Sequence, residues 1–199
     1  MREIADRPAD DPATREAWTG SPNADALAGA RRVVLPDGLG LVVRAIAPGD
    51  SRALQRLYAR LSARTIYFRF LAVAPTLTDE RARYFADADS VDRIALVVQD
   101  PDQPADVIAV ARYHRDAARA ARAELAVVVE DRWQERRIGS LLLRRLLDHA
   151  RDGGIDQLYG SAAAENRRIL HVLERLGLPL QVTRDGYLTR VDIWLSAVG

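Results

Sequence analysis

The stretch from Glu124 to Arg151 constrains the fold of this chain more than any other part of the sequence. Its first residues, Leu125 to Val129, form an apolar run that is rich in β-branched valine and too short for a buried helix, which predicts a strand. Apolar residues then follow at helical spacing, at Ile138, Leu141, Leu142 and Leu146. The polar residues between these two parts must turn the strand directly onto a helix N-terminus. Because such a terminus offers free backbone N–H groups and the positive end of the helix dipole, this turn is predicted to bind a phosphate.

The composition of the chain excludes several classes of function. Charged residues make up 29% of its 199 residues, but the formal net charge is only +1, so neither nucleic acid nor a membrane surface is expected as a partner. With no cysteine, the chain has no disulfide, no thiolate nucleophile and no cysteine-ligated metal. Its three histidines, His114, His149 and His171, are scattered, so no metal site is expected.

Targeting signals are also missing from the sequence. No apolar run approaches the roughly 20 residues that span a bilayer. The first residues lack the hydrophobic core of a signal peptide. The sequence therefore predicts a cytoplasmic protein, and it leaves the oligomeric state open.

The order of elements predicts the fold class. Residues 1–29 mix Asp, Arg, Ala and Pro with no apolar period, which is typical of a disordered tail, and residues 30–199 are expected to form one domain. Hairpins are predicted at Pro36-Asp37-Gly38 and at Asp185-Gly186. Between these hairpins, helices are expected to begin near residues 50, 62, 78, 138 and 166. Strands are expected to cover residues 94–98, 107–113, 124–129 and 155–161, and a loop is expected to cover residues 116–122. This order predicts one mixed α/β sheet with helices on both faces.

Three stretches resemble the GNAT superfamily of acyl-CoA-dependent N-acyltransferases. Gln134-Glu-Arg-Arg-Ile-Gly139 resembles the pyrophosphate-binding turn of that family, Gln/Arg-x-x-Gly-x-Gly/Ala, and the stretch from Asn166 to Gly177 resembles the helix after the neighbouring strand. Leu61 to Phe70 resembles the branch that contains bacterial protein-lysine acetyltransferases. In element order the resemblance covers roughly Arg31 to the C-terminus. It implies a mostly antiparallel, GNAT-like sheet and acetyl-CoA as cosubstrate.

The sequence departs from the family pattern at three positions. Arg137 stands where the family has its first motif glycine, and many members also carry glycine where Glu135 stands. Glycine there tolerates a positive φ and lets the backbone approach a pyrophosphate closely. The family often has a tyrosine, the acid toward the departing thiolate, where this chain has Leu173.

The resemblance implies a set of residues that bind the cosubstrate. The pyrophosphate is expected on the backbone of the turn, at Gln134, Glu135, Arg136, Arg137, Ile138, Gly139 and Ser140, and the alternative is an ordinary strand-to-helix turn. Val127 and Val129 share one face of the expected strand and are assigned to the same site. Asn166 is expected either to bond the pantetheine arm or to cap its own helix.

Acyl transfer to an amine requires a group that removes a proton from the ammonium. Glu124, at the start of the expected strand, resembles the general base of the protein-acetylating branch, and the alternative is a solvated glutamate at a strand end. His114 is a second base or a water-relay partner, or else a surface histidine. An acidic cluster of Asp87, Asp89 and Asp92 either attracts a cationic amine or is a solvated loop.

Together these features predict an acetyl-CoA-dependent N-acetyltransferase that acts by direct attack of an amine in a ternary complex. A covalent cysteine intermediate is excluded because the chain has no cysteine. The acceptor is a protein lysine, on the strength of the stretch from Tyr67 to Phe70, or a small-molecule amine. The alternative from another class is an acyl-CoA-binding regulatory module without turnover, which Glu135, Arg137 and Leu173 favour.

Overall fold

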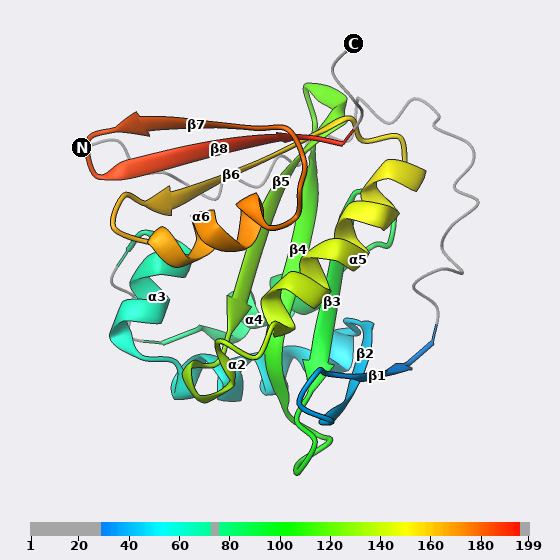
Figure 1. Cartoon of the computed structure of the whole chain (residues 1–199). Coiled ribbons are helices and arrows are strands. Elements are labelled where there is room, and N and C mark those ends of the chain that lie inside the picture. The colour runs from blue at the N-terminus through cyan, green and yellow to red at the C-terminus, as the bar shows by residue number, and fades with distance from the viewer. Residues whose placement is uncertain (1–28, 73–75, 196–199) are drawn as a thin grey trace.

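The computed structural model describes residues 29–72 and 76–195 and contains one eight-stranded sheet, in the order β1-β2-β3-β4-β5-β6-β8-β7 (Figure 1). All neighbouring strands pair antiparallel except β5 and β6, which are parallel. The mixed, mostly antiparallel sheet predicted from the sequence is confirmed. The tail predicted for residues 1–29 lies outside the described residues, apart from Gly29. The strands are β1 (Arg31–Val34), β2 (Gly40–Ala45), β3 (Arg93–Gln99), β4 (Val107–Asp116), β5 (Arg119–Val129), β6 (Gln157–Ala163), β7 (Leu180–Asp185) and β8 (Leu188–Trp194).

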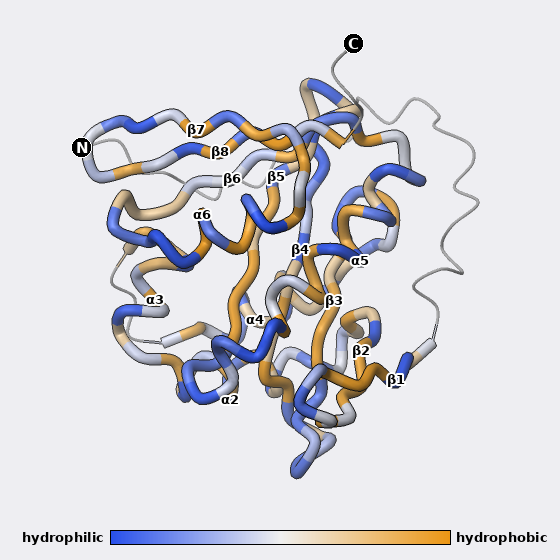
Figure 2. Tube along the Cα trace, in the orientation of Figure 1, coloured by the Kyte–Doolittle hydropathy of each residue, from blue (hydrophilic) through white to orange (hydrophobic). Residues whose placement is uncertain are grey.

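Helices cover both faces of this sheet, as predicted. On one face lie α2 (Ser51–Arg60), α3 (Ala63–Phe70) and α4 (Asp79–Ala86), and on the other lie α5 (Ile138–Asp152) and α6 (Arg167–Glu174) (Figure 1). Short 3-10 turns, η2 (Pro48–Asp50) and η3 (Asp131–Trp133), precede α2 and α5. The apolar stripes of the helices face the sheet, where they form one core under α2 and α4 and another under α5 and α6 (Figure 2).

Short polar side chains begin α3 and α4, as the sequence indicates. The Ser62 and Thr78 hydroxyls accept hydrogen bonds from Thr65 N at 3.2 Å and Arg81 N at 3.3 Å. Asp50 precedes α2 but makes no cap bond to it. Its carboxylate instead accepts from Arg44, at 2.6 and 2.7 Å, and from Ala47 N at 2.8 Å.

The loop predicted for residues 116–122 is wrong. Residues 117 and 118 form a two-residue turn, and β5 begins at Arg119 and pairs with β4. The alanine-rich segment carries no strand propensity of its own, so its extended form follows from pairing with β4, which no local pattern reveals. Glu124 therefore lies in the middle of β5 and not at its start, and His114 lies two residues before the end of β4.

A buried polar pair joins α5 to the sheet. The Tyr113 hydroxyl and His149 Nδ1 are 2.8 Å apart, and both residues are buried. His149 Nε2 has no hydrogen-bond partner among the described residues. Burial is the main cause that lowers the pKa of His149, with a smaller opposite effect from Asp152.

This pair predicts an acid-sensitive fold. Because the folded pKa of His149 lies below the unfolded value of about 6.5, the unfolded chain binds more protons, and the free energy of unfolding falls as pH falls below about 6.5. The slope from this residue is at most about 1.4 kcal/mol per pH unit. Urea titrations between about pH 7.5 and 5 test it, and His149→Gln should flatten the dependence while exposed His114 and His171 remain. An equally steep dependence in the variant would assign the effect elsewhere.

Candidate functional site

The two parallel strands separate part-way along the sheet. β6 pairs with β5 only at Arg122, Ala123 and Glu124, and Glu124 faces Tyr159 in the last pair. Beyond this pair, residues 125–129 have β4 on one side and no paired strand on the other. The strands thus form a wedge-shaped opening in the sheet, with Glu124 and Tyr159 at its apex.

The backbone of β5 lines this opening. The Leu125 carbonyl lies so close to Gly160 of β6 that a Cβ at Gly160 would approach that oxygen to 3.0 Å. Since alternate residues of a strand direct their N–H and C=O groups to the same side, Val127 and Val129 also present theirs to the opening. Their side chains pack on the core under α5 and α6. Apart from the Val129 carbonyl, which accepts from Gln134 Nε2 at 2.9 Å, this edge can form hydrogen bonds with an extended chain.

The turn from Gln134 to Ser140 lies at the wide end of the opening. Glu135 and Arg137 both have positive φ, 67° and 65°, which non-glycine residues rarely adopt. The backbone thus has the conformation that glycine favours, even though this chain places longer residues at both positions. The α5 helix begins directly after Arg137, so its first N–H groups point out of the helix toward this end of the opening.

The side chain of Glu135 is held by α6. Its carboxylate accepts from Arg168 Nη2 at 2.6 Å, and Arg168 also donates to the Gln134 side-chain oxygen. The negative charge at this position is therefore neutralised by a neighbouring guanidinium. This pairing weakens the repulsion that a carboxylate would otherwise exert on a bound phosphate.

The fold does not require glycine at position 139, in the first turn of α5. Gly139 has no positive φ, and a Cβ at this position would meet only Val129 Cγ2, at an ordinary 3.7 Å. The missing side chain instead leaves the first N–H groups of α5 uncovered.

Arg137 gives the first test of the turn. A non-glycine residue in the left-handed region costs about 1–2 kcal/mol, whereas glycine loses about 1 kcal/mol of flexibility on folding. Arg137→Gly should therefore leave the free energy of unfolding unchanged or raise it by up to about 1 kcal/mol. If the backbone binds the phosphate, affinity for acetyl-CoA should stay within a few fold of wild type by calorimetry. A large loss would make the guanidinium itself a ligand, and a large gain would favour the regulatory module.

Side chains around the turn fix it to β5 and α3. Gln134 Nε2 donates to Val129 O at 2.9 Å and to Thr65 Oγ1 at 3.3 Å. Asp131 accepts from Ser62 Oγ at 2.7 Å and from Thr65 Oγ1 at 2.8 Å. Burial alone would raise the pKa of Asp131, but these hydrogen bonds from α3 outweigh it and lower that pKa.

Two arginines near the turn, Arg132 and Arg136, differ in whether their side chains could assist a phosphate. Arg132 bonds the buried carboxylates of Glu130, at 2.6 Å, and Asp100, at 2.7 Å. It therefore anchors the end of β5. The Arg136 guanidinium lies over the ring of buried Trp133, 5.0 Å from its centroid, and its side chain is exposed. Of the two, only Arg136 remains available to assist a phosphate.

Glu124 and His114 are direct cross-strand partners on β5 and β4. Both side chains are exposed, and they face the side of the sheet that carries α2 and α4. They line an open pocket of about 100 Å³, the Glu124 pocket, together with Arg69, Phe70, Tyr84, Phe85, Asp87, Arg93 and Arg112. Two residues that the sequence analysis singled out separately thus lie in one site.

The acidic cluster is mostly neutralised. Asp89 accepts backbone hydrogen bonds from Val91, Asp92 and Arg93, and these bonds lower its pKa although burial would raise it. Arg93 lies near Asp87 at 3.5 Å, and Arg115 contacts Asp92 at 3.1 Å. Of the three acids only Asp87 lines the Glu124 pocket.

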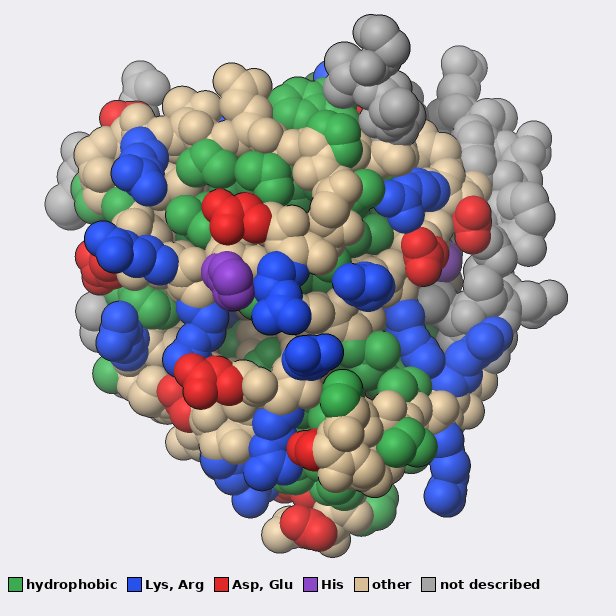
Figure 3. Space-filling view, viewed as in Figure 1, with side chains coloured by type: hydrophobic (Ala, Val, Ile, Leu, Met, Phe, Trp, Pro, Cys, Tyr) green, Lys and Arg blue, Asp and Glu red, His purple; other side chains and the backbone are tan. Residues whose placement is uncertain are grey.

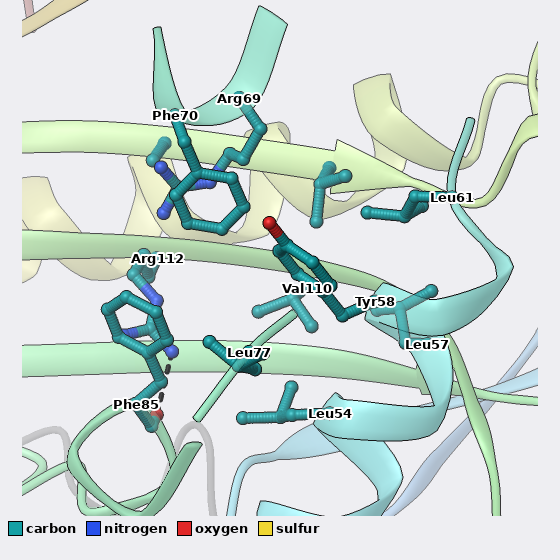
Figure 4. A pocket seen from close by; sticks show the side chains of 12 residues that line it. Leu54, Leu57, Tyr58, Leu61, Arg69, Phe70, Leu77, Phe85, Val110 and Arg112 are labelled. Carbon is teal, nitrogen blue, oxygen red and sulfur yellow. Dashed lines mark hydrogen bonds between the residues drawn. The ribbon is translucent and has the colours of Figure 1, made fainter. Parts of the chain in front are cut away.

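A narrower apolar pocket of about 40 Å³ adjoins the Glu124 pocket under α2. The two share Arg69, Phe70, Phe85, Arg112 and Ala126. Figure 4 shows the Tyr58 ring against Phe70, with 5.5 Å between the ring centroids, and Arg112 bonded to Phe85 O at 2.7 Å. Its other lining residues are apolar, Leu54, Leu57, Leu61, Leu77, Val110 and Val128.

On the opposite face of the sheet, α6 borders the opening without a catalytic hydroxyl. Leu173 is buried and packs in the core. Asn166 accepts from Ile169 N at 3.3 Å and so caps α6, which is one of the two roles expected for it. In the view of Figure 3, basic side chains gather around the start of α5 and along α6, where Arg136, Arg137, Arg144, Arg167, Arg168 and Arg175 are exposed.

Sequence reasoning missed Arg168 and Tyr159. The Arg168 contact depends on how α6 packs against the turn, and no local pattern encodes it. The position of Tyr159 depends on the parallel register of β5 and β6. Its only local signal is a tyrosine in the strand that follows the helix after the turn.

Comparison with known proteins identifies the family. Residues 41–179 match the family model described as Acetyltransferase (GNAT) domain. The chain belongs to this family. It is 30% identical over 135 residues to the Acetyltransferase Pat of Mycolicibacterium smegmatis, a match that covers 68% of this chain but only 40% of that protein.

Solved structures agree with this assignment to the GNAT acetyltransferases. The GNAT domain of S. lividans PAT is 29% identical with a TM-score of 0.75, and the match covers 82% of this chain and 95% of that one. The Salmonella typhimurium protein yncA, solved with its cofactor acetyl-CoA, shares the fold at 18% identity with a TM-score of 0.63, over 79% of this chain and 95% of that one.

Within the described residues, neither a metal-binding cluster nor a membrane-spanning helix is present. No group of three or more His, Asp or Glu side chains in residues 29–72 and 76–195 is arranged to hold a metal ion. Over the same ranges, none of the helices combines the length and the apolarity that a bilayer span requires.

Proposed function

We propose that this GNAT acetyltransferase transfers the acetyl group of acetyl-CoA to the side-chain amine of a protein lysine, by direct attack in a ternary complex. The observation that carries the proposal is the opening between β5 and β6. The turn before α5 lies at its wide end, where the N–H groups of the helix start favour an anion, and Glu124 lies at its apex and lines a pocket on one face.

Acetyl-CoA fits the residues along the opening. The backbone of Gln134 to Ser140 would hold its pyrophosphate, and the strand edge of Leu125, Val127 and Val129 would pair with its extended arm. The bound thioester supplies an activated acyl group. Asn166 caps α6 in this arrangement, and the exposed arginines around α5 and α6 favour an anionic ligand.

The Glu124 pocket suits a lysine side chain. Phe70, Tyr84 and Phe85 provide apolar walls for the methylene stem. The exposed carboxylate of Glu124 attracts the ammonium, whereas Asp87 pairs with Arg93, at 3.5 Å, and Arg112 donates to Phe85 O, at 2.7 Å. Glu124 then accepts a proton from that ammonium, and exposed His114 next to it passes protons to solvent. The resemblance of residues 61–70 to the protein-lysine branch supports the same acceptor.

Calorimetry with acetyl-CoA, followed by a thiol-release assay on lysine peptides and on small amines, tests the proposal. We expect binding and thiol release with lysine peptides. Thiol release with small amines but not with lysine peptides would identify a small-molecule amine as the acceptor. Binding without release on any acceptor would favour the regulatory module, which the non-glycine residues of the turn and Leu173 also suggest.

A further inference from the structure

Tyr159 lies at the apex of the opening. Register pairs place Arg93, His114, Glu124, Tyr159 and Asp192 in one row across β3, β4, β5, β6 and β8. Because register partners project from the same face, the Tyr159 side chain stands beside Glu124, about 5 Å away from backbone to backbone. Glu124 therefore has His114 on one side and Tyr159 on the other.

Two guanidiniums hold the Tyr159 ring. Arg122 lies 3.9 Å from the ring centroid and Arg190 lies 5.0 Å from it. Asp192 fixes both arginines, with Arg190 at 2.9 Å and Arg122 at 3.5 Å, and Asp116 contacts Arg122 at 3.6 Å. The half-buried ring is thus oriented by contacts to its faces.

The hydroxyl of this fixed ring is not used by the fold. None of the hydrogen bonds within residues 29–72 and 76–195 involves the Tyr159 hydroxyl. On the other face of the opening, α6 carries buried Leu173 at the position where the family often has a tyrosine. Tyr159 is therefore a hydroxyl held in place next to the proposed base, at the apex of the opening.

We propose that the Tyr159 hydroxyl donates a hydrogen bond, and finally its proton, to the sulfur that leaves during acyl transfer. This inference rests on the proposed function, since it needs the thioester at the apex of the opening. It makes Tyr159 a catalytic residue and assigns the acid role to β6 instead of α6.

The protons and electrons balance with the residues present. Glu124 passes the first ammonium proton to solvent by way of His114, and the amine lone pair forms the new carbon–nitrogen bond. Glu124 takes a second proton from that nitrogen as the carbon–sulfur bond breaks and its electron pair moves to sulfur. Tyr159 gives its proton to the sulfur, and Glu124 returns the second proton to the phenolate, which restores both side chains.

The environment keeps Tyr159 protonated before this step. Burial, and then the carboxylates of Glu124, Asp116 and Asp192, raise its pKa above the usual value of about 10. A phenol is a weaker acid than a thiol, so the hydrogen bond stabilises the developing thiolate and the return of the proton by Glu124 completes the transfer.

Tyr159→Phe tests this role because it removes only the hydroxyl. We expect kcat to fall about tenfold or more, with the KM for acetyl-CoA and the melting temperature little changed. A second readout does not depend on turnover. When CoA is bound, its thiol can be titrated by the ultraviolet absorbance of the thiolate, and we expect its pKa to rise by about one unit in the variant relative to wild type.

Tyr187→Phe is the matched control, since Tyr187 lies in the β7–β8 turn and is 69% exposed. It should leave both measurements at wild-type values. A Tyr159→Phe protein with wild-type kcat and an unchanged thiol pKa would overturn the inference while the proposed function stands. A wild-type protein that binds no acetyl-CoA would overturn both.

Discussion

Replacing Glu124 by glutamine should lower kcat by at least tenfold with little change in affinity for acetyl-CoA. A free lysine amine has a pKa near 10.4, so only about one molecule in a thousand is deprotonated at neutral pH. A positioned general base typically contributes about 10²–10⁴-fold, and glutamine keeps the shape of the side chain without its basicity. Glu124 is exposed at the apex of the opening and beside the pocket, where it can reach an incoming amine.

The dependence of this loss on pH separates a base from a merely electrostatic group. As pH rises toward the pKa of the amine, more of the acceptor is already deprotonated, so the deficit of Glu124→Gln should shrink. Glu174→Gln, an exposed change on α6, serves as the control and should have wild-type kcat throughout. Near wild-type kcat for Glu124→Gln at pH 7 would remove the assignment. His114→Gln would then be the next variant, and failure of both would leave an ordered water or the inactive module.

Local patterns predicted the elements of the fold better than their contacts. The apolar spacing of α5 and the cap residues Ser62 and Thr78 are written into consecutive residues, and the structure places each element close to its expected bounds. The hairpin that begins β5 could not be read this way, because its alanines and arginines become a strand only through pairing with β4. For the same reason Glu124, which was expected at the start of the strand, lies in the middle of β5.

The site depends on the same long-range pairings. The sequence singled out Glu124 and His114 separately, and only the β4–β5 register makes them neighbours. Glu135 and Arg137 have positive φ values, which both residue types normally avoid. A pattern of residue types therefore cannot predict this backbone conformation without the family resemblance. Tyr159 lies at the apex of the opening because its pair with Glu124 is the last between β5 and β6.

Gly139→Val should weaken acetyl-CoA binding by well over tenfold and leave the fold intact. The side chain at this position projects at the first turn of α5, where valine methyl groups would cover the N–H groups that the proposed pyrophosphate needs. The fold itself tolerates the change, because Gly139 has no positive φ and a Cβ meets only Val129 Cγ2 at 3.7 Å. Calorimetry measures the affinity, and circular dichroism with thermal melting measures the fold.

Gly139→Ala supplies the graded comparison within the same position. Alanine adds the one methyl group for which the structure has room and is a better helix former than glycine by about 1 kcal/mol, so this variant should melt no lower than wild type. Its affinity for acetyl-CoA should lie between those of wild type and Gly139→Val, because a larger side chain at position 139 covers more of the N-terminus of α5. If the folded valine variant bound acetyl-CoA as wild type does, the pyrophosphate could not lie on the start of α5. The pyrophosphate would then be expected on the exposed arginines along α6. In that case Arg168→Gln, which also removes the partner of the Glu135 carboxylate, should show the largest loss of acetyl-CoA affinity.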